Sequence, residues 1–301
     1  MQTERYLSVC IQQQGEFCEK MKNKISTILL AVFFLAGLSL LLYPTVSDYL
    51  NSLHSSRAVA AYDENIRGLN EETYQQILTD TREYNRLLFE KNVGFALSPE
   101  LKSRYSELLD IGENGIMGYI EIPNIKVSLP IYHGTDESIL QIAVGHLNWS
   151  SLPVGGESTH CVLSGHRGLP SAKLFTNLDK LVAGDTFVIR VLNEALTYEV
   201  DQILIVEPQE VESLKIEKGK DLCTLVTCTP YGINSHRLLV RGHRIETVNS
   251  TSVRVTSDAI RIEPLVVAPI VAFPILSALV IIVFTFDTKK KKRGENSEKQ
   301  S

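Results

Sequence analysis

Cysteine is scarce in this chain of 301 residues, and its thiols are unevenly spaced. There are five of them: Cys10, Cys18, Cys161, Cys223 and Cys228. This odd and irregular set excludes the small secreted domains that are held together by disulfides. No Cys-x-x-Cys pair with matching histidines occurs, so we expect no metal site. No other motif requires a cofactor, and we expect none.

Positive charge is not in excess. The formal net charge is −5, but residues 1–24 and 287–301 together carry ten Lys and Arg against six acids, so the middle, with 20 against 29, is more acidic than the whole. A protein that binds nucleic acid needs a basic face for phosphate contacts. The charge distribution therefore excludes nucleic acid as an expected partner.

Charge of either sign is absent from two long apolar stretches, residues 25–47 and 264–286. Each is close to the ~20 residues that cross the hydrocarbon core of a bilayer. The first follows Lys20, Lys22 and Lys24, and the second precedes the basic run 289–293. By the positive-inside rule, we expect a two-pass protein of the cell membrane with both termini in the cytoplasm and residues 48–263 outside.

A cleaved signal peptide is the alternative for the first stretch. It is less favoured because the stretch is longer than a usual signal core and no Ala-x-Ala site follows it at once. A chain that starts at Met21 would have a more usual N-terminus for an exported protein. Residues 1–20 are therefore a candidate artefact of the start-codon assignment. The expected order is a cytoplasmic N-terminus (1–24), an anchor (25–47) and an external part, followed by a linker (248–263), a second span (264–286) and a basic cytoplasmic tail (287–301).

The external part divides where the hydrophobic period changes. Residues 48–114 show apolar positions at spacings of three and four, which predicts a helical preface, and Ser98-Pro99 is typical of a helix start. Within 115–247, short segments rich in Ile, Val, Tyr and Thr alternate with turns, as in LTYEVDQILIV. Seven or eight such strands favour a mainly β domain closed into a barrel, because closure removes exposed edges.

Candidate chemistry lies at the ends of two predicted strands. One strand stops at Ser164-Gly165 and presents His166, and another ends in Cys228, with Arg237 opening the next. A thiolate is a nucleophile, an imidazole can move its proton, and a guanidinium can bind an oxyanion. On spacing alone the other interpretations stay open: a packed thiol, an idle histidine and a surface arginine. Strand alternation places Cys223 and Cys161 on the other face.

The segment Thr224-Leu225-Val226-Thr227-Cys228, followed by Arg237, resembles the signature Thr-Leu-x-Thr-Cys with a downstream Arg of the sortases. The similarity continues through residues 145–187 and 227–244 and is greatest to the class C, pilus-assembling sortases. It covers about residues 115–245. The resemblance implies a closed sortase β-barrel in which Cys228 is the nucleophile, His166 the general acid and base, and Arg237 the oxyanion group. Thr227 is a candidate substrate contact.

In that family the enzyme cleaves a Leu-Pro-x-Thr-Gly-like signal between Thr and Gly and holds the acyl group as a thioester. A lysine amine of the next pilin then takes it, so the resemblance implies pilins or surface proteins of a Gram-positive cell wall as partners. Three alternatives remain: a housekeeping sortase that anchors proteins to peptidoglycan, a thiol hydrolase, and a non-catalytic membrane adaptor.

A lid is the feature in which the sequence departs from class C. Members usually carry an Asp-Pro-aromatic motif that covers the cysteine, and this chain has no Asp-Pro anywhere. The nearest candidates are residues 92–95, with Phe95 as a plug, and residues 62–64. We expect residues 85–100 to lie near Cys228 but to close it loosely.

Overall fold

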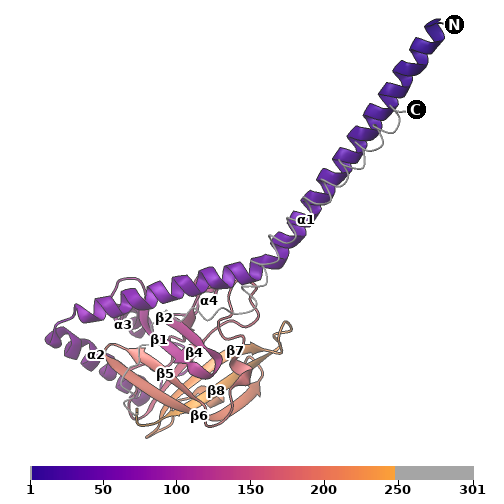
Figure 1. The fold of residues 1–301 in the computed structure, drawn as a ribbon. Coiled ribbons are helices and arrows are strands. Elements are labelled where there is room, and N and C mark those ends of the chain that lie inside the picture. The colour runs from indigo at the N-terminus through magenta and orange to yellow at the C-terminus, as the bar shows by residue number, and fades with distance from the viewer. Residues whose placement is uncertain (1, 248–301) are drawn as a thin grey trace. The chain divides into compact units, whose positions relative to one another are not determined.

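The computed structural model describes residues 2–247. The described part of the chain divides into two units, residues 2–45 and residues 46–247. Helix α1 (Gln2–Arg67) begins in the first unit and continues into the second (Figure 1). The expected linker, second span and basic tail, residues 248–301, lie outside the described residues.

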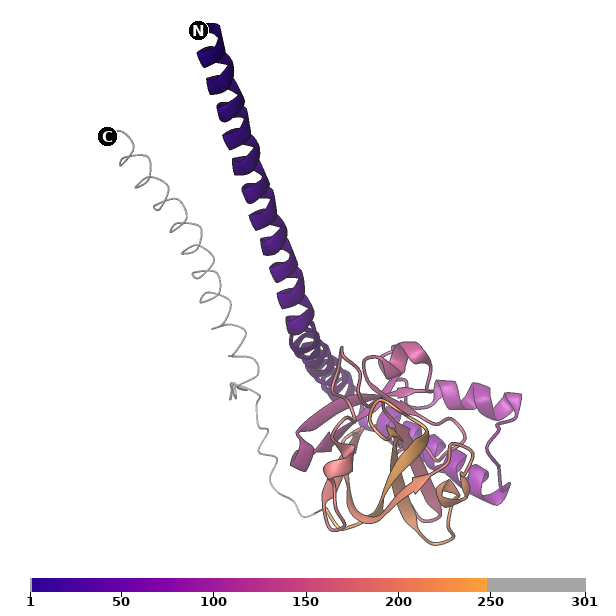
Figure 2. The same ribbon diagram turned by 90° about the vertical axis from the view of Figure 1, so that its right-hand side faces the viewer.

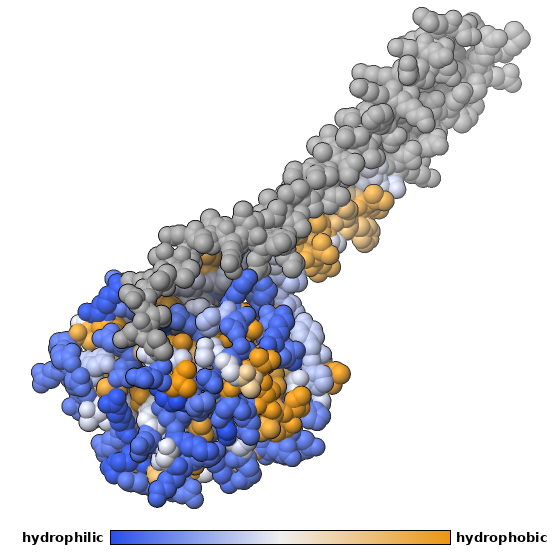
Figure 3. All heavy atoms as spheres, turned by 60° about the horizontal axis from the view of Figure 1, so that its bottom comes forward, coloured by the Kyte–Doolittle hydropathy of each residue, from blue (hydrophilic) through white to orange (hydrophobic). Residues whose placement is uncertain are grey.

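The apolar part of α1 meets the length and composition of a membrane span. Within Ile25–Arg67, an 18-residue window reaches a mean hydropathy of 2.6, and none of it is buried. Large side chains such as Leu30, Phe33 and Leu40 are more than 70 % exposed, and apolar residues gather along this described part of the helix (Figure 3). A signal sequence near the N-terminus passes the same test of length and composition.

The helical preface forms as predicted and is attached to the barrel. Helix α2 (Glu71–Glu90) begins at an Asn70 cap, and α3 (Pro99–Glu107) begins at Ser98, whose hydroxyl accepts from Leu101 N at 3.3 Å. The Asn85 side chain donates to Leu152 O and accepts from Leu152 N. From α1, the Tyr62 hydroxyl donates to Met117 O at 3.0 Å and accepts from Leu192 N at 2.9 Å. These buried bonds join the preface to the barrel.

Eight strands close into a barrel in the order β1-β2-β3-β4-β7-β8-β6-β5. Figure 2 shows the barrel from a second side. All neighbouring pairs are antiparallel except β2 with β3 and β4 with β7. A short helix α4 (Glu137–Leu140) precedes β3. The strands are β1 (Ile116–Ile122), β2 (Val127–His133), β3 (Val144–His146), β4 (Thr159–Ser164), β5 (Thr186–Val191), β6 (Glu194–Val206), β7 (Asp221–Thr229) and β8 (His236–Arg244).

The closed mainly β architecture confirms the prediction, and β3 is the strand that the pattern did not contain. It has three residues, too few for an alternation to appear. The longer strands fill the interior with fully buried side chains, among them Ile120, Leu163, Tyr198, Leu225 and Val240. Because successive strand residues face opposite sides, the remaining positions of β4, β7 and β8 point to the outer face. The predicted catalytic residues of β7 and β8 lie on this face.

Candidate active site

Cys228 and Arg237 lie opposite each other at the ends of two paired strands. The antiparallel register of β7 and β8 matches Cys228 to Arg237 directly. Both residues are partly exposed, whereas Thr227 and Leu238, their neighbours on the inner face, are buried. In an antiparallel pair, directly opposed residues have Cβ atoms about 4.5–5.5 Å apart on the same face. The register therefore brings the predicted nucleophile and the predicted oxyanion group together.

His166 lies in the turn that follows β4, and this turn is hydrogen-bonded to β7. Strand β4 runs parallel to β7, with Ser164 opposite Val226, and the turn follows at once. Gly165 N donates to Val226 O at 3.1 Å, and His166 O accepts from Phe175 N at 3.1 Å. A Cβ at Gly165 would lie 2.7 Å from the Phe175 ring, so only glycine fits before the histidine. Both ends of the turn are thus tied down next to the strand that carries the cysteine.

Thr227 has a different partner from the one predicted. Its side chain is on the inner face, 2 % exposed, and its hydroxyl donates to Gly165 O at 2.7 Å. Successive residues of β7 face opposite sides, so Thr227 points inward and Cys228 points outward. The hydroxyl therefore positions the histidine turn, and the predicted substrate contact has no support from this geometry.

A carboxylate lies beside the imidazole, and backbone carbonyls hold the guanidinium. The carboxylate of Glu137, on α4, lies 3.5 Å from His166 Nε2. A hydrogen bond from Gln141, together with the nearby imidazole, lowers the pKa of Glu137. Arg237 Nη1 donates to the carbonyls of Asn234 and His236, which sets the orientation of the guanidinium plane. The sequence analysis missed Glu137, because no spacing rule links α4 to the histidine turn.

An apolar cluster lies on the outer face of these strands. Its buried members are Val162, Leu214, Val226 and Leu239, and we call it the outer cluster. Val226 stands two residues before Cys228 and Leu239 two residues after Arg237, so both share the face of the predicted catalytic pair. Leu214 comes from the loop between β6 and β7. A buried apolar cluster, covered by the loop between β6 and β7, therefore adjoins the thiol along β7 and β8, and partly buried side chains such as Leu147 and Val206 form its edge.

Comparison with known proteins identifies the family of this chain. The Sortase domain family model matches residues 120–245. The crystal structure of sortase C1 from Streptococcus agalactiae is 49 % identical, covers 64 % of this chain and 100 % of its own, and has a TM-score of 0.62. The chain belongs to the sortase family, in class C.

Further relatives agree. The structure of Clostridium perfringens sortase C with the C-terminal cell wall sorting motif is 44 % identical, covers 64 % of this chain and 100 % of its own, and has a TM-score of 0.57. Sortase D of Bacillus subtilis is 32 % identical over 131 residues, which are 42 % of this chain and 63 % of that protein. The protein is therefore a sortase, an enzyme of the cysteine transpeptidase type.

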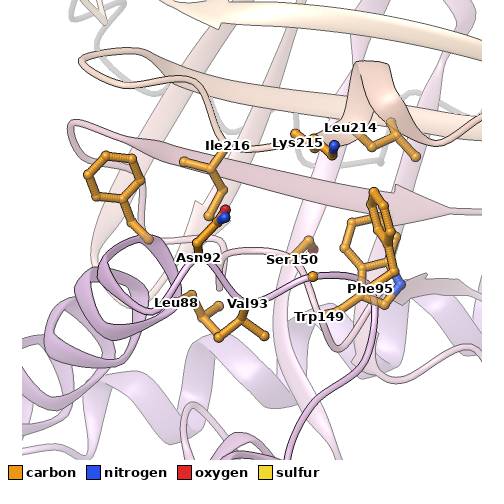
Figure 4. A pocket seen from close by; sticks show the side chains of 11 residues that line it. Leu88, Asn92, Val93, Phe95, Trp149, Ser150, Leu214, Lys215 and Ile216 are labelled. Carbon is orange, nitrogen blue, oxygen red and sulfur yellow. The ribbon is translucent and has the colours of Figure 1, made fainter.

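A pocket of about 120 Å³ lies between the preface of the sortase and its barrel (Figure 4). Phe95 forms one wall and packs edge-on against Trp149, with ring centroids 4.9 Å apart. Leu214, a buried member of the outer cluster, also lines this pocket. Trp149, which packs against the cluster, lines it too. Cys228 does not line the pocket. Phe95 therefore contacts Trp149, and its predicted role as a plug over Cys228 stays a prediction without a contact to support it.

We expect the Cys228 thiol to react readily with a cysteine-directed reagent in the resting sortase. Replacing Phe95 with alanine, or deleting residues 92–97, should change that rate by less than about tenfold, equivalent to 1.4 kcal/mol. The reason is that Phe95 rests on Trp149. Timed labelling, followed by peptide mass mapping of Cys228, measures the rate. Phe89→Ala, in the same pocket, is the matched control, and a thiol that is inert until the segment is removed would reveal a closing lid.

Arg167 is a second residue that the sequence analysis missed, although it directly follows His166. Its guanidinium pairs with Asp179, donates to Thr229 Oγ1 at 3.3 Å, and lies 6.0 Å from the centre of the Tyr231 ring. These contacts link the histidine turn to the segment after Cys228. We infer from them a positioning role for Arg167.

His160 supports the loop that carries Leu214. It is fully buried, with Nδ1 donating to Lys215 O at 2.8 Å and Nε2 accepting from Thr224 Oγ1 at 2.7 Å. Burial lowers the pKa of His160, Arg241 lowers it further, and Glu217 and Asp201 oppose the change. The folded sortase therefore holds this imidazole neutral.

Acidification should destabilise the fold through His160. The unfolded imidazole takes up a proton near pH 6.5, more readily than the folded one, so stability is complete above that pH and falls as the pH drops below it. We expect a lower unfolding temperature at pH 5 than at pH 7.5, measured on the full chain in detergent. His160→Gln should remove only part of this pH dependence. The rest remains because burial also lowers the pKa of His133. His54→Ala, at an exposed position of α1, should leave the pH dependence unchanged; an unaltered pH dependence in the His160 variant would refute the assignment.

Proposed function

We propose that this sortase cleaves a Leu-Pro-x-Thr-Gly-like sorting signal between Thr and Gly and joins the threonyl acyl group to a lysine amine of a pilin. Successive transfers would polymerise pilin subunits. The register that sets Cys228 opposite Arg237, beside the fixed His166 turn, is the observation that carries the proposal. The class C relationship supports the pilin as acceptor.

Each proposed residue has a defined step. The Cys228 thiolate attacks the threonyl carbonyl, and Arg237 stabilises the negative oxygen of the tetrahedral intermediate. His166 gives its proton to the departing glycine amine, which leaves a thioester on Cys228. The lysine amine then attacks the thioester, His166 receives a proton from it, and the Cys228 thiolate leaves. One peptide bond breaks and one amide bond forms. The thioester holds the acyl group between the two steps, so the transfer outside the cell needs no separate energy source.

The partly buried apolar side chains at the edge of the outer cluster, among them Leu147, Trp149 and Val206, offer a surface for the apolar part of the signal. Leu and Pro of the motif precede the scissile bond, and burying apolar side chains contributes about 25 cal/mol per Å² of area removed from water. Val226 and Leu239 lie two residues from Cys228 and Arg237 on the same face. We propose that the signal lies along β7 and β8 with its Leu-Pro end toward Leu214.

The proposed location follows from the two apolar stretches. Residues 25–47 would anchor the sortase, with residues 48–114 as an external preface and 115–247 as the catalytic barrel. The apolar helix segment within Ile25–Arg67 supports the first anchor. The second, 264–286, rests on the sequence pattern and on its basic flank. Both termini would then be cytoplasmic and the reaction extracellular.

Product analysis tests the proposal. The full-length sortase in detergent is incubated with a labelled sorting-signal peptide and one of three acceptors: a pilin lysine peptide, a peptidoglycan-type amine, or water alone. We expect a lysine amide and, without an amine, an acyl adduct mapped to Cys228. Exclusive use of the wall amine would favour a housekeeping sortase, release of acid at a rate that amines do not divert would indicate a thiol hydrolase, and no cleavage would indicate an adaptor.

A further inference from the structure

Two thiols meet inside the barrel, and the proposed reaction uses neither. Cys161 on β4 is paired in register with Cys223 on β7, and both are free and buried, at 3 % and 0 % exposure. Neighbouring strands lie about 4.7–4.9 Å apart, a separation within the roughly 4.4–6.8 Å that Cα atoms of a disulfide span. In-register partners face the same side, and the two thiols are joined by a side-chain hydrogen bond, so the two sulfur atoms are neighbours.

A buried histidine adjoins this pair. His146 Nε2 lies 2.9 Å from Ser151 O, and a carbonyl only accepts, so Nε2 carries the ring proton. Nδ1 lies 3.1 Å from the Tyr105 hydroxyl and can take up a second proton, and the imidazolium that results favours a thiolate at Cys161. The pKa of the Cys161 thiol is raised by burial, but hydrogen bonds with Cys223 and His146 outweigh this effect and lower it. Burial raises the pKa of Cys223. One thiol of the pair is therefore the easier to ionise.

We infer that Cys161 and Cys223 form an oxidation site, at which a small oxidant of the peroxide class converts the two thiols into a disulfide inside the barrel. The Cys161 sulfur attacks one peroxide oxygen, the O–O bond breaks, and a sulfenic acid and water result. The Cys223 sulfur then attacks the Cys161 sulfur, the S–O bond breaks, and the hydroxide leaves as water with the thiol proton. Two thiols and one hydrogen peroxide thus give one disulfide and two waters.

Other uses of the pair fit the structure less well. In the described part of the chain, His, Cys, Asp and Glu side chains do not gather in groups of three or more that would hold a metal ion. Both sulfur atoms point into the barrel, opposite to the outer face of Cys228, so a peptide has no access to them. A peroxide molecule is small enough to reach the pair through brief local opening of the barrel.

The disulfide would join the two strands that carry the proposed catalytic residues. Cys161 stands five residues before His166, and Cys223 five residues before Cys228. It would close a long loop of the chain, which restricts the unfolded state and raises the unfolding temperature. Transpeptidation itself should persist, because the outer face of β7 keeps its free thiol. Only this last consequence rests on the proposed function.

Mass mapping of the full chain tests the oxidation site. A Cys228→Ser variant in detergent is treated with hydrogen peroxide, alkylated after denaturation and digested without reductant. We expect a linked peptide pair joining Cys161 and Cys223, about 2 Da lighter than the two thiol peptides together, because two hydrogens are lost. The unfolding temperature should rise, and dithiothreitol should reverse both changes. The mapping does not depend on activity, so it is independent of the proposed reaction.

Cys161→Ala and Cys223→Ala, each made in the Cys228→Ser chain, are the matched controls. Neither should show the linked pair or the rise in unfolding temperature. The inference also stands without these variants, since the linked peptide is sought in a chain that retains both buried thiols. Alkylation of Cys161 and Cys223 after peroxide treatment, or their recovery as separate sulfinic acids, would overturn it.

Discussion

Replacing Cys228 with alanine should abolish transpeptidation and leave the barrel folded. The side chain is partly exposed at the end of β7, so its loss creates no large cavity, whereas an alanine has no atom that can hold the acyl group. We expect the rate to fall by at least about a thousandfold, as for the loss of other nucleophiles. Mass analysis of the amide product measures the rate, and the unfolding temperature checks the fold.

Cys223→Ala is the matched control, because it removes a thiol from the other face of the same strand. It should show the opposite pattern, with transpeptidation retained and stability lowered by about 1 kcal/mol, since Cys223 is fully buried. Continued polymerisation by a well-folded Cys228→Ala protein would remove the nucleophile assignment.

Arg237→Ala and His166→Ala should each lose most of the activity, and Arg237→Lys should not restore it. One guanidinium nitrogen is held by the carbonyls of Asn234 and His236, so the planar group is oriented relative to Cys228 across the strand pair. A lysine ammonium is a point charge without that forked geometry. By analogy with the removal of an oxyanion donor, we expect a loss of about 10²–10³ in kcat.

Two exposed positions provide the controls for this pair. Arg86→Lys changes an arginine whose side chain is 59 % exposed on α2, and His54→Ala changes an exposed histidine of α1. Neither should alter the rate of amide formation, measured with the same labelled peptide. Full activity of Arg237→Lys would reduce Arg237 to a source of positive charge.

Local patterns in the sequence were enough to predict a strand, a helix start, the two faces of β7 and the family of this protein. The alternation in residues 196–201 predicts a strand with one buried face, and β6 (Glu194–Val206) contains it. Ser98 and Pro99 predict the start of α3 because capping depends on neighbours only a few residues apart. The alternation along β7 also separates Cys223 from Cys228, and the burial of Cys223 confirms it. The resemblance to the sortases followed from the motif Thr224 to Cys228 with Arg237 downstream, and from longer stretches at residues 145–187 and 227–244.

Only the tertiary structure decided which distant residues meet. Strand β3 is too short to have a period, and the parallel pairing of β4 with β7 joins segments more than fifty residues apart, so no local rule places Cys161 beside Cys223. The same pairing gives Thr227 its bond to Gly165, and the fold around α2 sends Phe95 to Trp149. Sequence periodicity records which face of an element is buried, whereas barrel closure determines which elements become neighbours.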